Sequence, residues 1–376
     1  MNNLESLLTA KSGDTLEYKP LIFDLNKDEN QTVVSNLFST GKIHRVVDDY
    51  QEQVKELFQI DNPPLIFDKN FNQLFDAQWQ KLVGEGPLAE RGRWVYFPWS
   101  ATLVHVLKDD EFQKVRTARN RELITEAEQK KFYTKVVGVA GMSVGSSVVL
   151  AIILQGGARH IKLADHDRMA LSNLNRIRSG IQFLGLPKVE MTAQQIYEVN
   201  PYAEVEIFPE GLTAENMDSF FDGLDIMIDE IDNLAAKYLI REQAKKRRLA
   251  VVMAADNGDS GVVDIERYDL DQETPFFHGR MGEVTHDSLK KLDKPGIGQM
   301  IARHIGKENE PLRMKQSLAA MGKTIVSWPQ LGGTALLNGS AVAYCVRKIA
   351  LGEPLQPNRA IISLDEKLDP NYHQNG

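Results

Sequence analysis

The chain has 376 residues, of which 42% are hydrophobic and 26% are charged, values typical of a globular protein with room for about two domains. Acidic residues outnumber basic ones by 52 to 44, giving a formal net charge of −8, which argues against broad binding to nucleic acids or to anionic membranes. The single cysteine, Cys345, excludes an intramolecular disulfide and a multi-cysteine zinc site, and without a signal-peptide pattern or an apolar run of membrane-spanning length we expect a cytoplasmic protein.

Residues 1–114 are predicted to form a smaller α+β domain of unknown role, with substrate recognition as one possibility. Strands are predicted at Thr15–Ile22 and around Trp94–Leu107, and helices at His44–Phe58 and Asn72–Leu82. The aromatic residues of the second strand region would either form a peptide-binding surface or fill the core of the domain. The core interpretation is favoured, because large aromatic side chains mostly lie inside proteins.

A charged stretch, Asp109–Tyr133, is predicted to be helical and solvated. A buried strand at Val136–Val139 follows it, and an apolar helix begins at Ser146. The turn between them is rich in glycine, with Gly138, Gly141 and Gly145. Such a turn leaves backbone N–H groups free at the positive end of a helix dipole and lets a phosphate approach closely. The strict Gly-x-Gly-x-x-Gly spacing is absent, because Ala140 stands at the second glycine position.

The next strand, Ile161–Ala164, ends at Asp165, about 20 residues beyond the glycine turn. In nucleotide-binding βαβ units, an acidic residue at this distance typically binds a ribose hydroxyl. Residues 172–176 are predicted to form a short helix or loop, and Lys188 heads a helix at Val189–Val199. The alternation of strands and helices predicts an α/β fold with a mostly parallel sheet.

Further polar residues follow the same pattern. Asp167, Asn173, Arg176 and Lys188 come after the second strand, and Asp229 and Asp232 come after a strand at Leu224–Ile228. Because the carboxyl ends of parallel strands meet at one edge of a sheet, these side chains are expected to gather there. Two cations, an amide and several carboxylates suit a triphosphate with magnesium, and a dinucleotide would need few of them.

The remaining elements extend the sheet. They are a strand at Glu204–Phe208, helices at Thr213–Phe221 and Leu234–Arg247, strands at Leu249–Ala254 and Val262–Tyr268, and a closing strand at Asn358–Lys367. Residues 275–330 are predicted to be a helical and loop-like insertion, and an apolar helix broken by glycine follows it. Cys345 lies within that helix, so we interpret it as a buried side chain and not as a nucleophile.

Four motifs together resemble the ThiF/MoeB family, the bacterial relatives of the ubiquitin-activating enzymes: Asp165–Asp167, Ser172–Arg176, Gly185–Lys188 and Asp229–Asn233. The resemblance covers about residues 116–366. It implies that residues 115–376 form a Rossmann-like adenylation domain, with a mostly parallel sheet flanked by helices. It also implies adenylation of a carboxylate with ATP and Mg²⁺, the carboxylate belonging to a small protein, a peptide or a small-molecule acid.

The resemblance implies a role for each candidate residue. The three glycines line the nucleotide, Asp165 and Asp167 contact it, Asn173, Arg176 and Lys188 hold the phosphates, and Asp232 places magnesium. Arg119 or Arg121 would reach the ATP of a partner subunit in a homodimer. The cysteine and CxxC elements of some relatives are absent from the sequence, so we expect no zinc and a transfer of the acyl group directly to an external nucleophile.

Two other functions are weighed against this one. The altered glycine loop and the missing cysteine leave open a catalytically silent nucleotide-binding scaffold. The glycine turn with Asp165 also allows an NAD(P)-dependent oxidoreductase, although that function leaves Arg176, Lys188 and Asp232 unexplained. The histidines show none of the spacings typical of a metal site.

Overall fold

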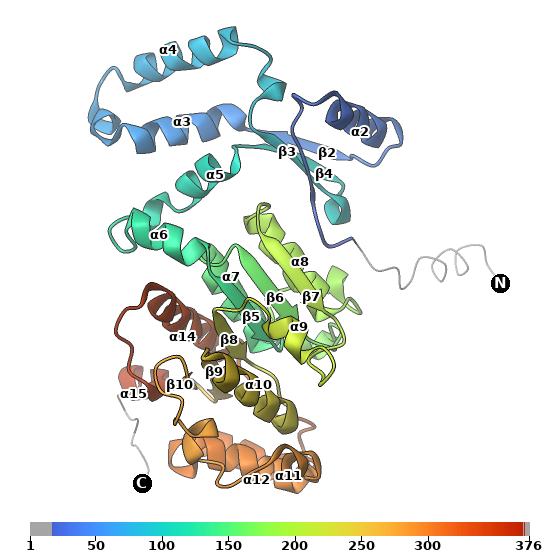
Figure 1. The fold of residues 1–376 in the computed structure, drawn as a ribbon, viewed down its shortest axis with the longest axis vertical. Helices are drawn as coiled ribbons and strands as arrows, with labels where there is room; N and C mark the ends of the chain where they lie inside the picture. Colours follow the sequence, from blue (N-terminus) through green and yellow to red (C-terminus); the bar gives the residue numbers. More distant parts are fainter. Residues whose placement is uncertain (1–16, 371, 373–376) are drawn as a thin grey trace, which may run out of the picture. The chain divides into compact units, whose positions relative to one another are not determined.

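A computed structural model describes residues 17–370 and residue 372 (Figure 1). The described chain divides into two compact units. The first comprises residues 17–127 together with 197–202, and the second comprises residues 128–196 together with those from 203 onward. In this described part, every helix is too short or too polar to cross a membrane.

The first unit is α+β and contains a four-stranded sheet in the order β1-β3-β4-β2. Strands β2 and β4 are parallel, and the other pairs are antiparallel. The elements of this unit, in chain order, are β1 (Leu21–Phe23), α2 (Asp28–Ser39), β2 (Arg45–Asp48), α3 (Tyr50–Asp61), η1 (Pro63–Phe67), α4 (Phe71–Gly84), η2 (Leu88–Glu90), β3 (Arg93–Phe97), η3 (Pro98–Ser100), β4 (Thr102–Val106), α5 (Asp109–Arg116) and η4 (Ala118–Asn120).

Three sequence predictions for this unit were wrong in part. The helix predicted at His44–Phe58 begins only at Tyr50, because the preceding residues form β2 and pair with β4. The strand predicted at Thr15–Ile22 appears as the shorter β1, and its first two residues lie outside the described chain. The charged stretch Asp109–Tyr133 is not one helix, since α5 ends at Arg116 and a separate helix, α6 (Glu126–Tyr133), follows.

The aromatic residues of β3 lie in the core of the first unit. Trp94 and Tyr96 are buried and pack with Phe23 and Leu37, so the core interpretation is confirmed for these two residues. Trp99 is only partly buried and donates a hydrogen bond from Nε1 to Glu198 Oε1 at 2.8 Å.

The second unit contains a seven-stranded sheet in the order β11-β10-β9-β8-β5-β6-β7. Strands β7, β6, β5, β8 and β9 are parallel, and β10 and β11 add antiparallel strands at one edge. This confirms the predicted mostly parallel α/β sheet. Its strands are β5 (Val136–Ala140), β6 (His160–Ala164), β7 (Glu204–Phe208), β8 (Ile226–Asp229), β9 (Ala250–Asn257), β10 (Ser260–Arg267) and β11 (Asn358–Ser363).

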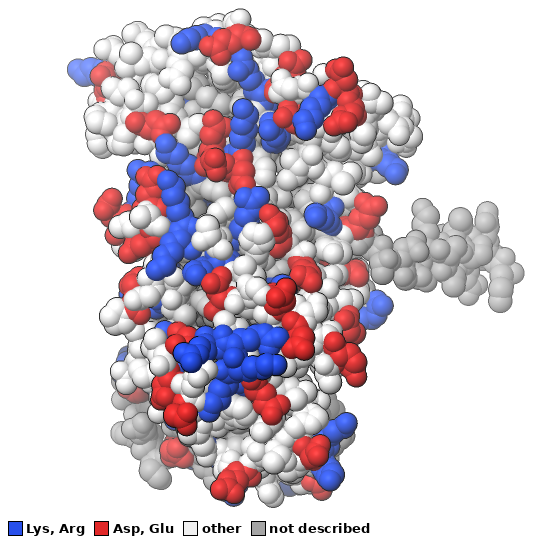
Figure 2. All heavy atoms as spheres, viewed as in Figure 1, with Lys and Arg blue, Asp and Glu red and all other residues white. Residues whose placement is uncertain are grey.

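The helices of the second unit lie against this sheet or against one another (Figure 1). They are α7 (Val144–Leu154), η5 (Leu171–Asn173), η6 (Ile181–Phe183), α8 (Lys188–Val199), α9 (Met217–Phe221), α10 (Leu234–Arg247), η7 (Phe276–Gly279), α11 (His286–Lys290), α12 (Lys294–Ile305), η8 (Lys307–Asn309), α13 (Leu312–Ala320), α14 (Gly332–Leu351) and α15 (Leu364–Leu368). On the face shown in Figure 2, Lys and Arg side chains gather over α10, whose last turn carries three of them.

The longest helix, α14, packs along α7. A Cβ atom at Gly339 would lie 2.7 Å from the Cβ of Ser147 on α7, so this glycine permits a close helix–helix contact. The expectation of a helix broken by glycine was therefore wrong, because α14 runs through Gly339 without interruption.

Two other boundaries differ from prediction. The helix predicted from Thr213 begins at Met217, because Thr213 and Asn216 bond to each other's backbone N–H groups and form a turn. The predicted closing strand ends at Ser363, whose hydroxyl caps the short helix α15 by accepting a hydrogen bond from the backbone N–H of Glu366.

Candidate functional site

The carboxyl ends of four neighbouring parallel strands, β6, β5, β8 and β9, form what we call the carboxyl edge. The glycine loop follows β5 there. Gly141 has φ +89°, and a Cβ atom on it would lie 2.3 Å from the carbonyl oxygen of Glu230, so both its conformation and its close approach to β8 require glycine. Gly145 lies in the first turn of α7. Gly138 lies inside β5, where an added side chain would meet Phe220 and Leu224, so core packing accounts for this glycine.

The N-terminus of α7 lies at the end of this loop, where the first backbone N–H groups of the helix have no partner within the helix. Its N-cap residue, Ser143, makes no side-chain hydrogen bond to the helix. The dipole of the helix favours an anion at this end. The Ser143 hydroxyl instead accepts a hydrogen bond from Arg176 Nε at 2.9 Å. A cation and the positive end of a helix therefore meet at the same loop.

Asp165 joins the loops that follow β5 and β6. Its Oδ2 accepts a hydrogen bond from the backbone N–H of Met142 at 2.6 Å, and its Oδ1 accepts one from Asp167 N at 2.7 Å. The side chain is buried. This carboxylate thus fixes the shape of the glycine loop, a contact that the sequence motif did not reveal.

Asp167 and Lys188 form an ion pair, with Lys188 Nζ 2.7 Å from Asp167 Oδ2. The Lys188 side chain is buried, whereas the Asp167 side chain is 55% exposed. Partial burial acts against ionisation of Asp167, but the hydrogen bond and charge of Lys188 outweigh it and lower the pKa of that carboxyl. The ammonium group is therefore held at the carboxyl edge beside an acid that solvent reaches.

Asn173 and Arg176 belong to the loop around η5. Asn173 is buried, and its Oδ1 accepts a hydrogen bond from Ala170 N at 3.0 Å, which stabilises the turn. Arg176 Nη1 donates to Asn175 Oδ1 at 2.9 Å and to Ser172 O at 3.3 Å. The loop thus holds the Arg176 side chain, which points its Nε at the start of α7.

The acidic residues after β8 differ in their surroundings. Asp229 is fully buried and Asp232 is exposed. Asn233 caps α10, since its Oδ1 accepts a hydrogen bond from Ala236 N at 3.0 Å. Asp232 makes no hydrogen bond or ion pair within the described chain. Its carboxylate is therefore open to a ligand, while Asp229 is a structural residue.

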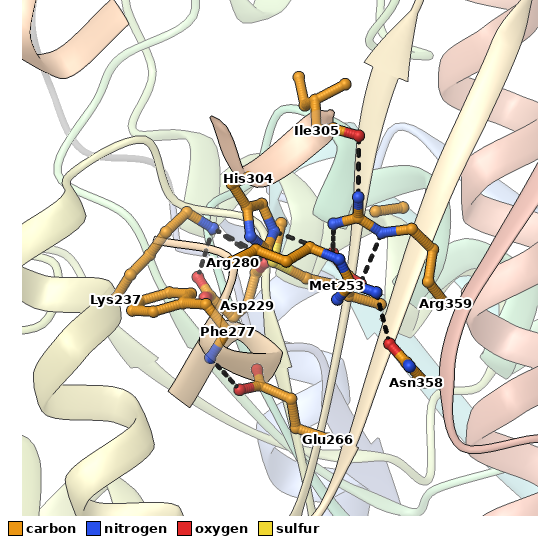
Figure 3. A network of polar contacts seen from close by, with 12 residues as sticks. Asp229, Lys237, Met253, Glu266, Phe277, Arg280, His304, Ile305, Asn358 and Arg359 are labelled. Carbon is orange, nitrogen blue, oxygen red and sulfur yellow. Dashed lines mark hydrogen bonds and ion pairs between the residues drawn. The ribbon is translucent and has the colours of Figure 1, made fainter. Parts of the chain in front are cut away.

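Asp229 belongs to what we call the buried ion network (Figure 3). In one group, Asp229 pairs with Lys237 at 3.1 Å and with Arg241, whose Nη2 lies 2.8 Å from Glu266 Oε2. Burial acts against the charge of Arg241, but the two carboxylates outweigh it and raise the pKa of its guanidinium. The ring of Phe277 lies 4.2 Å from the Arg241 guanidinium carbon.

The other group of the network surrounds Asp264, which is buried on β10. Its carboxylate lies 2.6 Å from Arg359 Nη2 and 2.9 Å from His304 Nε2, and Arg280 is 3.5 Å away (Figure 3). Burial acts against ionisation, but the hydrogen bonds from His304 and Arg359 hold the pKa of Asp264 well below its usual range. This group ties β10 and β11 to α12.

Sequence reasoning missed one buried acid at the carboxyl edge, Asp256 near the end of β9. It is 4% exposed. Burial raises its pKa, and the negative charge of Asp232 adds to this, while hydrogen bonds from Asn338 and Gln330 and the charge of Arg176 act in the opposite direction. The pKa of Glu230 is also raised, first by burial. Asp256 belongs to no sequence motif, so its place beside Asp232 and Arg176 is known only from the folded chain.

The candidate arginines of the dimer interface lie in the first unit. Arg119 is in η4, and Arg121 follows it and pairs with Glu126 at 3.3 Å. Among described residues, one group of three possible metal ligands has donor atoms within 4.8 Å of one another, namely Asp165, His166 and Asp167. Asp232 is not part of that group.

Cys345 is buried in α14, and burial raises the pKa of its thiol to about 11. A thiol with that pKa is almost entirely protonated at neutral pH, so Cys345 is a poor nucleophile as it lies in the fold. This confirms the expectation that Cys345 is a buried side chain.

The chain is similar to several known proteins. An uncharacterized protein of Mycobacterium tuberculosis (strain CDC 1551 / Oshkosh), MT1398, is 37% identical over 282 residues, which cover 75% of this chain and 39% of that protein. A sulfur carrier protein adenylyltransferase of Thermus thermophilus is 27% identical over 168 residues, covering 44% of this chain and 59% of that protein. The chain thus matches less than two thirds of the length of either relative.

Among solved structures, that of E. coli MccB with ATP has a TM-score of 0.49 and 15% sequence identity, and the match covers 69% of this chain and 77% of that one. The family model described as "ThiF family" matches residues 117–359, which are well over half of the chain and include the whole carboxyl edge. The chain belongs to the ThiF family.

Proposed function

We propose that this chain uses ATP to adenylate a carboxylate and that it releases pyrophosphate. The observation that carries the proposal is the convergence at the carboxyl edge of Arg176, Lys188 and the uncapped N-terminus of α7. All three favour a polyanion. Membership of the ThiF family supports the same chemistry, and adenylyltransferases are among the family relatives.

In this reaction the protein mainly has to position the carboxylate and ATP, and no covalent intermediate with the protein is needed. A carboxylate oxygen of the substrate attacks the α-phosphorus of ATP, a new P–O bond forms, and the bond to the bridging oxygen breaks. Pyrophosphate leaves with that electron pair, and an acyl-adenylate remains. Arg176 and Lys188 would stabilise the negative charge on the phosphates, and Asp165 would hold both the glycine loop and the ribose.

Magnesium would be held through Asp232, whose carboxylate is exposed and has no partner in the described chain. Magnesium favours oxygen ligands and usually binds one or two carboxylates together with substrate phosphates, so a single carboxylate at the edge suits it. When bound, the ion would neutralise charge on the phosphates. Zinc does not enter this proposal.

The acyl substrate would be the C-terminus of a small protein or peptide, or a small-molecule acid. The first unit would help to recognise it. Since the Cys345 thiol is buried with a raised pKa, we propose that an external nucleophile attacks the adenylate directly. A cytoplasmic location fits a chain whose lone cysteine cannot form an intramolecular disulfide.

We also propose that the active form is a homodimer. Large apolar side chains are exposed on two adjoining segments, near η5 and η6 and at the start of α14: Leu171, Ile181, Leu184, Leu331 and Leu336. Asn175 Nδ2 donates to Gln330 O at 2.8 Å, which holds the two segments together. Such exposed apolar residues are typical of an interface. A partner's Arg119 or Arg121 would then complete the phosphate site.

The test is pyrophosphate exchange. The purified chain is incubated with MgATP, labelled pyrophosphate and candidate carboxylates, and the transfer of label into ATP is measured. Exchange that depends on one class of carboxylate supports adenylation. ATP binding without exchange for any carboxylate would support the silent scaffold, and binding of NADH without ATP would support the oxidoreductase.

A further inference from the structure

Gln330 bridges two parts of the carboxyl edge that are distant in sequence. Its side-chain Nε2 donates a hydrogen bond to Asp256 Oδ2 at 3.0 Å, and its backbone carbonyl accepts one from Asn175 Nδ2 at 2.8 Å. Trp328 Nε1 also lies 3.4 Å from the backbone oxygen of Asp256. The segment before α14 is therefore held between the end of β9 and the loop around η5.

The chain of contacts continues to the phosphate-binding candidate. Asn175 uses its Nδ2 for Gln330 and its Oδ1 to accept from Arg176 Nη1 at 2.9 Å. Arg176 Nε then donates to Ser143 Oγ at 2.9 Å. Since Asn175 binds on both sides, a shift of Gln330 displaces the group that orients the Arg176 guanidinium. The result is an unbroken path from Asp256 to the start of α7.

Asp256 differs from three other buried acids of this unit in how its charge is held. Asp229, Asp264 and Glu266 each form an ion pair, whereas Asp256 has no cation within ion-pair distance in the described chain. Two neutral amides hold it instead: Gln330, and Asn338 Nδ2 at 2.7 Å. Burial of a carboxylate without a paired cation is costly. In this respect Asp256 resembles Asp165, the other buried acid of the carboxyl edge, which two backbone N–H groups hold and which has no ion pair in the described chain.

We propose that Asp256 and Gln330 are positioning residues that orient Arg176 for the phosphates of the nucleotide. The inference rests on the proposed ATP-dependent function and adds two residues to it. Neither residue would touch the nucleotide. Asp256 fixes the side chain of Gln330, the backbone of Gln330 fixes Asn175, and Asn175 fixes the guanidinium.

The experiment exchanges the carboxylate and the amide. Gln330→Glu places a carboxylate against Asp256 and breaks the hydrogen bond, whereas Asp256→Asn with Gln330→Glu restores it with its direction reversed. Gln330→Leu removes the donor without adding charge. We expect the affinity for MgATP, measured by calorimetry, to fall about tenfold in Gln330→Glu and about fivefold in Gln330→Leu. The double variant is expected to return to within about threefold of the unaltered chain.

The matched control is Val326→Glu, which adds the same charge to the same segment at a side chain that is 98% exposed. Its affinity for MgATP is expected to be unchanged, and thermal unfolding checks that all variants fold. Two results would overturn the inference: both Gln330 variants binding as the unaltered chain does, or the double variant staying as weak as Gln330→Glu. If the unaltered chain itself did not bind MgATP, the proposed function would fall, and this inference with it.

Discussion

The carboxyl edge and the buried ion network lie next to each other in the second unit, and both are built from charged side chains. In the network, Asp229 and Glu266 are fully buried, and both pair with Arg241, which is fully buried as well. At the carboxyl edge, Asp232 is exposed and makes no hydrogen bond or ion pair with the described residues, and Arg176 donates hydrogen bonds to the neutral groups of Ser143, Ser172 and Asn175. The two regions contain the same residue types. They differ in that Asp229, Arg241 and Glu266 all have ion-pair partners, whereas at the edge Lys188 is paired with Asp167 but Arg176 and Asp232 have no ion pair in the described chain.

This difference distinguishes charges that stabilise the fold from charges that can bind a ligand. A buried charge with its counter-charge in place contributes to a unique fold, and removal of either partner is destabilising. A cation or carboxylate that lacks a counter-charge at an open edge retains its capacity to bind a ligand. Asp229 and Asp232 lie three residues apart and differ in this respect, so we expect neighbours in one motif to have unrelated roles.

The largest effect is expected in the network. Arg241→Met leaves Asp229 and Glu266 buried without their shared cation, so the free energy of unfolding should fall by about 3–5 kcal/mol. Chemical denaturation monitored by circular dichroism measures this. A loss below about 1 kcal/mol would show that the network is not the structural counterpart of the edge.

Variants at the carboxyl edge are expected to lose activity and to keep their folding stability. Arg176→Ala and Asp232→Asn should reduce pyrophosphate exchange about 100-fold or more, because the first would remove a cation that holds the phosphates and the second would remove the carboxylate that holds magnesium. Both side chains are at least partly exposed, so the free energy of unfolding should change by less than about 0.5 kcal/mol. Full exchange activity in either variant would contradict the assignment of the site.

Lys188 has features of both the buried ion network and the carboxyl edge, because its side chain is buried but its partner Asp167 is half exposed. Lys188→Met should weaken MgATP binding about tenfold and lower the free energy of unfolding by about 1 kcal/mol. Calorimetry and denaturation on the same variant give both values. If only one of them changed, Lys188 would belong wholly to one region.

The smallest expected effect is a dependence of stability on pH. The pKa of Asp264 is lowered in the fold, so the unfolded chain binds its proton first, and the stability due to Asp264 is present above its usual pKa of 3.8 and lost as the pH falls below it. The slope for one proton is at most about 1.4 kcal/mol per pH unit. Asp264→Asn should show a shallower slope between pH 5 and pH 3, which are ~1 unit either side of that value.

The sequence predicted the parallel part of the sheet well, because its strands are buried on both faces and read as continuous apolar runs. Helix α10 was predicted at Leu234–Arg247 and has those bounds. In the first unit, β2 was read as part of a helix and α2 was not predicted. The partner strand of β2 is β4, which lies more than fifty residues later, and a local pattern does not contain that pairing.

The sequence predicted which residues lie at the carboxyl edge where a motif contains them, and it missed residues that only three-dimensional proximity brings there. Arg176, Lys188 and Asp165 lie at the carboxyl edge, as expected from their spacing. Lys237 and Arg241 repeat at a helical interval that resembles a solvated face, and Asp256 belongs to no motif. Their partners come from other strands and helices, so their roles follow only from the folded chain.

Cys345 gives this protein a built-in reporter. As the only thiol of the chain, buried in α14 against the rest of the second unit, it is shielded from alkylating reagents while the helix stays docked. Labelling of the unaltered chain would therefore time the opening of the second unit at a single position, with no engineered probe. Comparison of the labelling rate with and without MgATP would show whether nucleotide binding slows the opening of that unit.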